Sequence, residues 1–172
     1  MAQLDIINVP DPLLKTKSTP VDKVDADVRR LLDDMLETMY AAPGIGLAAI
    51  QVAVAKRMIV MDTAAEGEDK RPQFFINPEV VWESDEVNTY SEGCLSVPEH
   101  YADVERPASV RVKYLDYDGN MQEDLMEGLN ATCIQHEIDH LNGVVFIDYL
   151  SRLKRNMIIK KVQKATKDSV VL

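Results

Sequence analysis

The sequence predicts a single α+β domain over residues 1–172, in which antiparallel strands pack around a central helix, with one further helix toward each end. Three observations lead to this fold class. An apolar stripe of helical period lies near the N-terminus, short segments rich in Val and Tyr fill the middle, and the pattern HExxH follows in a helical stretch. A chain of 172 residues with 46% hydrophobic residues is long enough to bury one sizeable core.

The N-terminal part predicts an amphipathic helix. Its apolar side chains recur at intervals of three and four, namely Val28, Leu31, Leu32, Met35, Leu36 and Met39. Asp22 or Asp25 suits the N-cap position, and Pro43 followed by Gly44 ends the helix. The next residues, 44–51, read GIGLAAIQ and are expected to form a loop of small residues with one polar side chain at its end.

The middle of the chain predicts strands joined by short turns. The first strands are expected at residues 57–62, 74–76 and 80–82, and several more between 87 and 116. Asn77 and Pro78 are expected to form a turn between two of the short strands. Asp118, Gly119 and Asn120 predict the turn of a hairpin.

A helix is predicted over residues 129–141, with Asn142 and Gly143 as its stop, and it carries the pattern HExxH. His136 and His140 are four residues apart, so both project from one face of the helix about one turn apart. That spacing allows two imidazoles to bind one divalent metal ion, with Glu137 beside them as a candidate proton carrier. The sequence therefore predicts a metal-binding helix.

Two histidines leave a catalytic metal ion short of its usual three protein ligands. From the residues alone, the candidates for the third ligand are Cys94, Cys133, His100 and the carboxylates. Cys133 shares the helical stripe, but it lies ~10 Å along the helix axis from His140, since each residue adds ~1.5 Å. A small residue that faces a pocket is the favoured interpretation of Cys133.

The C-terminal part predicts a last helix that begins near Ser151 and continues toward Leu172. It is locally basic, with Arg152, Lys154, Arg155, Lys160, Lys161, Lys164 and Lys167. The formal net charge of -10 argues against nonspecific nucleic-acid binding by the whole chain. The basic helix is therefore either a solvated face or a contact with an RNA-rich partner such as a ribosome.

Targeting signals are not evident in the sequence. Residues 1–12 have neither the basic nor the apolar region of a signal peptide, and no apolar run approaches the ~18 residues of a membrane span. The two cysteines are expected to be reduced thiols, as is usual in the cytoplasm.

Three separated segments together resemble peptide deformylase of the bacterial type. They are GIGLAAIQ at residues 44–51, EGCLS at 92–96 and QHEIDH at 135–140, in the order that the family has. The opening INVPDP at residues 7–12 and DYLS at 148–151 are also similar to that family, so the resemblance covers essentially the whole chain.

The resemblance implies a role for particular residues. It implies that Cys94, His136 and His140 bind the metal, that Glu137 is the general acid and base, and that Gln51 and the Leu95 backbone N–H polarise the scissile carbonyl. The residues implied to border the substrate groove are Ile45, Gly46, Glu92, Gly93, Leu129 and Cys133. Many bacterial members have an arginine where this chain has Tyr101, which leaves contacts beyond the first residue of the substrate open.

The implied activity is removal of the formyl group from the N-terminal formylmethionine of nascent peptides in the cytoplasm, with release of formate. The implied metal is Fe²⁺, for which Ni²⁺, Co²⁺ or Zn²⁺ would substitute. HExxH alone also fits a metalloprotease, and a closed structural metal site or a peptide-binding module without turnover is a further alternative. The remaining alternative is a family member that has lost its activity.

Overall fold

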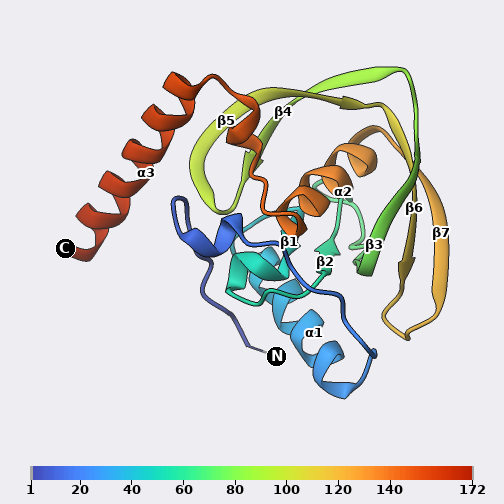
Figure 1. Ribbon diagram of the computed structural model, residues 1–172. Coiled ribbons are helices and arrows are strands. Elements are labelled where there is room, and N and C mark those ends of the chain that lie inside the picture. Colours follow the sequence, from blue (N-terminus) through green and yellow to red (C-terminus); the bar gives the residue numbers. More distant parts are fainter. Residues whose placement is uncertain (1, 172) are drawn as a thin grey trace.

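Two antiparallel sheets and three α-helices make up the part of the chain that the computed structural model describes, which is residues 2–171 for the backbone and 2–165 for the side chains (Figure 1). The larger sheet has the order β1-β2-β3-β6-β7, and β4 pairs with β5 in a second sheet. The strands are β1 (Gly46–Ala48), β2 (Met58–Met61), β3 (Gln73–Glu83), β4 (Val87–Cys94), β5 (Val97–Pro107), β6 (Ser109–Leu115) and β7 (Met121–Glu127). The helices are α1 (Ala26–Ala41), α2 (Gly128–Leu141) and α3 (Arg152–Val171), with 3-10 turns η1 (Pro12–Lys15), η2 (Ala49–Val52) and η3 (Phe146–Tyr149). The predicted α+β class with antiparallel strands is confirmed.

Strand β2 is buried on both faces, and this places α2 in the interior. Ile59 and Met61 pack in one core cluster with side chains of α2, whereas Met58 and Val60 pack in another with side chains of α1. The unbroken apolar run of β2 follows from this double burial, because a strand covered on both sides has no face to leave polar. Helix α2 therefore lies between the larger sheet and the β4–β5 pair (Figure 1).

Helix α1 begins as the sequence predicts. The side chain of Asp25 accepts a hydrogen bond from the N–H of Val28 at 2.9 Å, so Asp25, rather than Asp22, is the N-cap. The helix ends at Ala41, just before Pro43. Helix α3 begins at Arg152, next to the expected Ser151, and the expected end at Leu172 lies outside the described residues.

The expectation of two short strands around a turn at Asn77 and Pro78 is wrong. One strand, β3, runs through both residues, with an irregular register against β6 at this point. Asn77 adopts a positive φ of 52°, which asparagine tolerates better than most residues, and its side chain bonds the backbone N–H and C=O of Val21 at 2.8 and 2.9 Å. The local signal of a turn was real, but it produces a bulge inside a continuous strand.

The predicted loop over residues 44–51 is also only partly correct. It contains the short strand β1, which pairs with β2, and the 3-10 turn η2, which ends in Gln51 and Val52. The N-terminal segment passes beside this turn: the N–H of Ile7 donates to the carbonyl of Gln51 at 2.8 Å. Strand β1, the turn η2 and the N-terminal segment thus meet around Gln51.

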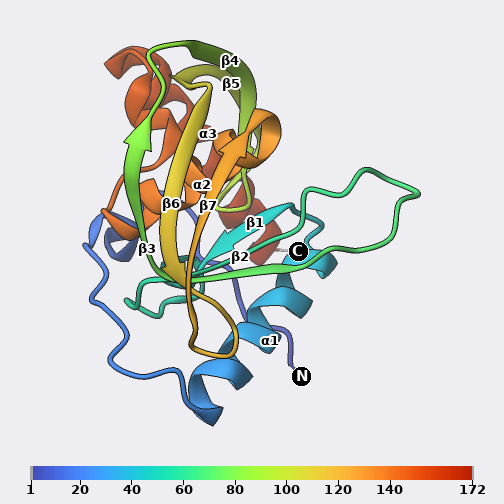
Figure 2. The ribbon, with the colours of Figure 1, turned by 90° about the vertical axis from the view of Figure 1, so that its right-hand side faces the viewer.

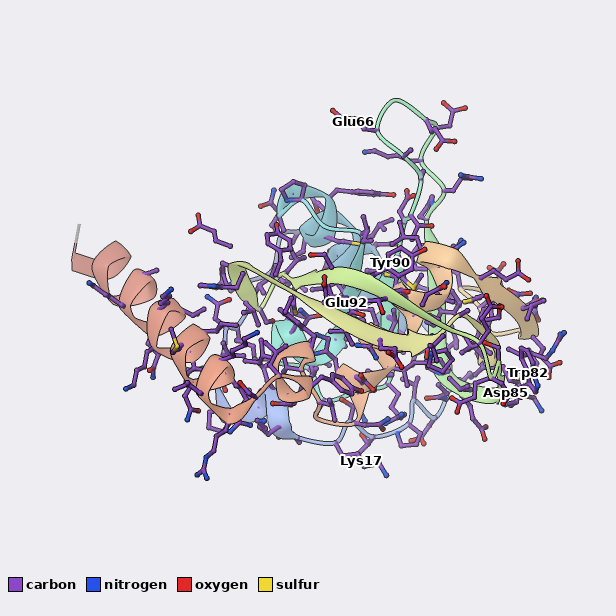
Figure 3. The ribbon with its side chains drawn as sticks, turned by 90° about the horizontal axis from the view of Figure 1, so that it is seen from above. Lys17, Glu66, Trp82, Asp85, Tyr90 and Glu92 are labelled. Carbon is purple, nitrogen blue, oxygen red and sulfur yellow. The ribbon has the colours of Figure 1, made fainter. Side chains whose placement is uncertain are left out.

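Two parts of the chain project from the body. Helix α3 extends away from the sheets (Figure 1), and the loop between β2 and β3 reaches out with Glu66 near its tip (Figures 2 and 3). No helix in the described part of the chain has both the length and the apolar character needed to cross a bilayer.

Candidate active site

Three potential metal ligands converge at the buried face of α2. One ligand atom each of Cys94, His136 and His140 lies within 4.8 Å of the others. The Sγ atom of Cys94 is 3.2 Å from Nε2 of His140. The two histidines come from adjacent turns of α2, and the cysteine comes from the end of β4, so a strand end delivers the thiol to the helix from outside.

The two other residues weighed as third ligand do not join this group. Cys133, one turn before His136, points its thiol toward the carbonyl of Ile45 at 3.8 Å, and burial raises the pKa of that thiol. His100 lies in the wall of the same cavity, on the irregular part of β5 beyond the β4–β5 turn. Both cysteines are free thiols.

Glu137 lies beside the three ligands and is 4% exposed. Burial raises the pKa of its carboxyl to about 7. The charge of the nearby Glu92 also raises this pKa, whereas His136 lowers it. Its Oε1 atom has no hydrogen-bond partner among the described residues. A buried carboxyl with a free oxygen and a pKa near neutrality is suited to exchange a proton with a bound molecule.

The side chain of Gln51 is buried and held by hydrogen bonds. Its Oε1 accepts a hydrogen bond from the N–H of Ala48 at 2.9 Å, and its Nε2 donates to Ser96 Oγ at 3.1 Å and toward Cys94 Sγ at 3.5 Å. The side-chain amide therefore presents N–H groups beside the convergence of the three ligands. Leu95 lies next to it in the turn between β4 and β5.

A cavity of about 750 Å³ opens over these groups, a volume typical of ligand sites. All twelve predicted site residues except His140 line it, among them the six groove residues Ile45, Gly46, Glu92, Gly93, Leu129 and Cys133. The wall is tight at Gly46, where a Cβ would lie 2.6 Å from Glu137 Oε2 and 2.8 Å from Cys133 Sγ. At Gly93, the ring of Tyr101 lies directly over the position of a Cβ.

Glu92 lines the cavity, but its carboxylate is hydrogen-bonded to other protein side chains. It accepts hydrogen bonds from Nδ1 of His136 at 2.9 Å and from Nε and Nη2 of Arg106 at 2.6 and 2.9 Å. Burial alone would raise the pKa of Glu92, but the bonds from His136 and Arg106 outweigh it and lower the pKa below its usual value. Glu92 is therefore a charged partner of the metal-ligand candidate His136.

Sequence reasoning missed Arg106. The signal was present, because residues 102, 104 and 106 alternate inward on β5, so Arg106 falls in phase with the buried Val104. An inward-facing arginine requires an acidic partner. Which acid it meets, however, depends on the pairing of β4 with β5.

The three-ligand group, the buried glutamate and the flanking amide together suit metal-assisted hydrolysis of an amide. The family model of polypeptide deformylase matches residues 3–156. The chain belongs to the peptide deformylase family. Peptide deformylases are metal-dependent hydrolases that remove the N-formyl group from nascent peptides, and the chain is an enzyme of this kind.

Similar deformylases extend over nearly the whole chain. The peptide deformylase of Phenylobacterium zucineum is 63% identical over 167 residues, which are 97% of this chain and 99% of that protein. A crystal structure of peptide deformylase from Ehrlichia chaffeensis has a TM-score of 0.94 at 46% identity and covers 98% of this chain and 99% of its own. A second structure from that organism, in complex with actinonin, has a TM-score of 0.92 at 48% identity, with 96% and 98% covered.

The donor set of this deformylase fits a divalent transition metal. A thiolate and two imidazoles are ligands that Fe²⁺, Co²⁺, Ni²⁺ and Zn²⁺ all accept. Burial lowers the pKa of His140 well below its usual value, which keeps its lone pair free for a metal. Three protein ligands would leave a position for water or substrate, as catalytic sites require and closed structural sites do not.

Proposed function

We propose that residues 1–172 form one catalytic domain that hydrolyses the formyl–nitrogen bond of N-terminal formylmethionine in newly made polypeptides. The observation that supports this most is the convergence of Cys94, His136 and His140 beside the buried carboxyl of Glu137. The three side chains hold the metal, and Fe²⁺ is the proposed ion, with Ni²⁺, Co²⁺ or Zn²⁺ as substitutes. When bound, such an ion lowers the pKa of water toward neutrality and polarises a carbonyl.

Glu137 moves the proton in this reaction. Its carboxylate takes a proton from the attacking water and returns it to the nitrogen of methionine, because an amine leaves poorly without a proton. The carboxyl is close enough to the ligands for this transfer, since its Oε2 lies 3.9 Å from Nε2 of His136. The products are formate and a free N-terminal amine.

Gln51 and Leu95 stabilise the charge that develops on the formyl oxygen. The Gln51 amide is held by Ala48 and Ser96, so it need not reorganise during the reaction. The backbone N–H of Leu95 supplies a second donor from the adjacent turn. One such preorganised donor is typically worth about 3 kcal/mol of transition-state stabilisation.

The cavity selects the substrate by shape. The formyl carbon carries only a hydrogen besides its oxygen and nitrogen, and the close wall at Gly46 leaves little room for a larger acyl group. Ile45, Leu129 and Cys133 form the apolar part that takes the methionine side chain. The remaining peptide lies extended along residues 90–93 of β4, which face the cavity and pair with β5 on their other side.

Formate release from a formyl-Met tripeptide tests the reaction, with the acetyl-Met tripeptide as the matched control. The expected result is formate from the formyl peptide and no acetate from the acetyl peptide. Cleavage at internal bonds would instead indicate a metalloprotease.

Cys94→Asp is expected to keep some metal and lose most activity. Full activity in that variant would remove Cys94 from the site.

The basic side chains of α3 form the second part of the proposal, a contact with the ribosome. The helix projects from the body and carries Lys154, Lys160 and Lys161, while the chain as a whole has a net charge of -10 (Figure 1). A helix so placed meets RNA phosphates without bringing the acidic body close. Co-sedimentation with ribosomes should fall on truncation after Leu150, whereas equal sedimentation would contradict the contact.

Nascent formylated chains are made in the cytoplasm, which is the proposed location.

A further inference from the structure

A chain of hydrogen bonds leads from His136 to the protein surface. It begins at Nδ1 of His136, which is 2.9 Å from Oε1 of Glu92. Both oxygens of Glu92 accept from Arg106, and Nη1 of Arg106 then donates to Oδ2 of Asp139 at 2.8 Å. The hydroxyl of Tyr149 donates to the same Asp139 oxygen at 2.6 Å.

The inner half of this chain is buried and the outer half is not. Glu92 and Arg106 are 6% and 5% exposed, whereas Tyr149 is 54% exposed. Tyr149 ends η3, just before α3 begins, and its ring lies 5.1 Å from the guanidinium carbon of Arg106. The same turn η3 supplies Phe146, whose ring stacks on the imidazole of His136 with centroids 6.0 Å apart. The turn thus touches the proposed ligand directly through one aromatic residue and indirectly through the other.

The two histidines of the site differ in how their second nitrogen is held. Nδ1 of His140 is buried without a hydrogen-bond partner among the described residues. Nδ1 of His136 donates to Glu92, which fixes the tautomer that leaves Nε2 free on the side of the ligands. The orientation of His136 therefore depends on Glu92, and the orientation of Glu92 depends on Arg106, which binds both of its oxygens.

Asp139 holds Arg106 in place. The guanidinium uses two nitrogens on Glu92 and the third on Asp139, so the two carboxylates together fix its plane. Tyr149 completes the arrangement by donating to Asp139 from the outside. Without that hydroxyl, the partly buried Asp139 carboxylate keeps its ion pair with Arg106 but loses the second bond that holds its orientation.

We infer that Asp139 and Tyr149 are positioning residues for His136, acting through Arg106 and Glu92. This inference rests on the proposed metal site, but not on the identity of the substrate. Tyr149→Phe keeps the ring over Arg106 and removes only the outer hydrogen bond. Tyr117→Phe is the matched control, because Tyr117 also donates its hydroxyl to a carboxylate, Asp33, at 3.2 Å and does not line the cavity.

The test uses the Co²⁺-substituted protein, whose visible absorption reports the geometry of a thiolate and imidazole site. Tyr149→Phe should shift the visible bands and speed the release of Co²⁺ to a chelator about threefold, because it removes only the outermost bond. Asp139→Asn should speed release about tenfold or more, which is the usual effect of losing a group behind a ligand. For Fe²⁺-loaded enzyme, kcat should fall with little change in KM. The control Tyr117→Phe should leave the spectrum and release rate as in the unaltered protein.

The result that would overturn the inference is an unchanged Co²⁺ spectrum and release rate in Tyr149→Phe, even if its melting temperature falls. Such a result would make the chain of bonds purely structural. If Asp139→Asn does not fold, the comparison of Tyr149→Phe with Tyr117→Phe still decides whether the chain of bonds positions His136. Failure of the proposed function would look different, because the unaltered protein would then bind Co²⁺ with a thiolate band yet release no formate with any of the four metals.

Discussion

Gly46 shows how closely single residues constrain this site. A methyl group there would lie 2.6 Å from Glu137 Oε2 and 2.8 Å from Cys133 Sγ, and both belong to the buried helix α2. Gly46→Ala is therefore predicted to displace the carboxyl and lower kcat/KM about 100-fold, as misplacement by ~1 Å can. Gly44→Ala is the comparison: its Cβ would meet the side chain of Leu95, which can move more easily. A larger loss at Gly44 than at Gly46 would contradict this explanation.

Asp62 determines part of the pH dependence of stability. Burial raises the pKa of its carboxyl, but hydrogen bonds from Tyr40 and from the N–H groups of Ala64 and Arg71 outweigh burial and lower the pKa below its usual value. A carboxyl with a lowered folded-state pKa stabilises the fold above its unfolded-state pKa of about 4 and loses this contribution as the pH falls through the folded-state value.

Asp62→Asn is accordingly predicted to lower the free energy of unfolding by about 1–3 kcal/mol at pH 7. The difference from the unaltered protein should shrink as the pH falls from about 4 toward the lower folded-state pKa, because below that value the carboxyl is neutral in both states. Urea unfolding at a series of pH values measures this. A difference that stays constant down to pH 2 would show that charge is not the cause.

The elements differ in how much of them the sequence reveals. Helix α1 is predictable because its apolar spacing, its N-cap Asp25 and its stop residues agree. Helix α2 has no side-chain cap and is predictable from the HExxH spacing and from the stop after Leu141. Strand β3 is not, since Asn77 and Pro78 carry a local turn signal that pairing with β2 and β6 overrides. In the site, the resemblance implied three metal ligands and the role of Glu137, and the structure brings these residues together, while their roles remain predictions. The bond between Arg106 and Glu92 depends on strand register, which local pattern does not fix.

The N-cap of α1 offers a prediction confined to one element. Asp25→Ala removes the bond to the N–H of Val28 and should cost about 1 kcal/mol of stability, or about 2–4 °C in melting temperature. Activity should not change, because neither Asp25 nor Val28 lines the cavity. Asp27→Ala, in the same first turn with only an exposed ion pair to Arg30, is the control and should cost less. Equal losses would argue against capping.

For the whole molecule, we expect the fold to survive without a metal. The core clusters around α1, α2 and η3 contain large buried apolar side chains that belong to neither the ligands nor Glu137. Removal of metal by a chelator is predicted to abolish formate release while circular dichroism still shows a folded, cooperatively melting protein at a lower temperature. Loss of the fold on chelation would mean that the metal is structural.

Bound metal and formate release, measured together, test the proposed reaction most directly. Unaltered protein and Glu137→Ala are both loaded with Fe²⁺ under anaerobic conditions and assayed on a formyl-Met tripeptide. We predict one Fe²⁺ per chain in both proteins, turnover in the first, and loss of turnover in the variant without loss of fold. Turnover that survives in the metal-loaded variant would contradict the role of Glu137. An unaltered protein that binds Fe²⁺ and releases no formate would contradict the proposed function.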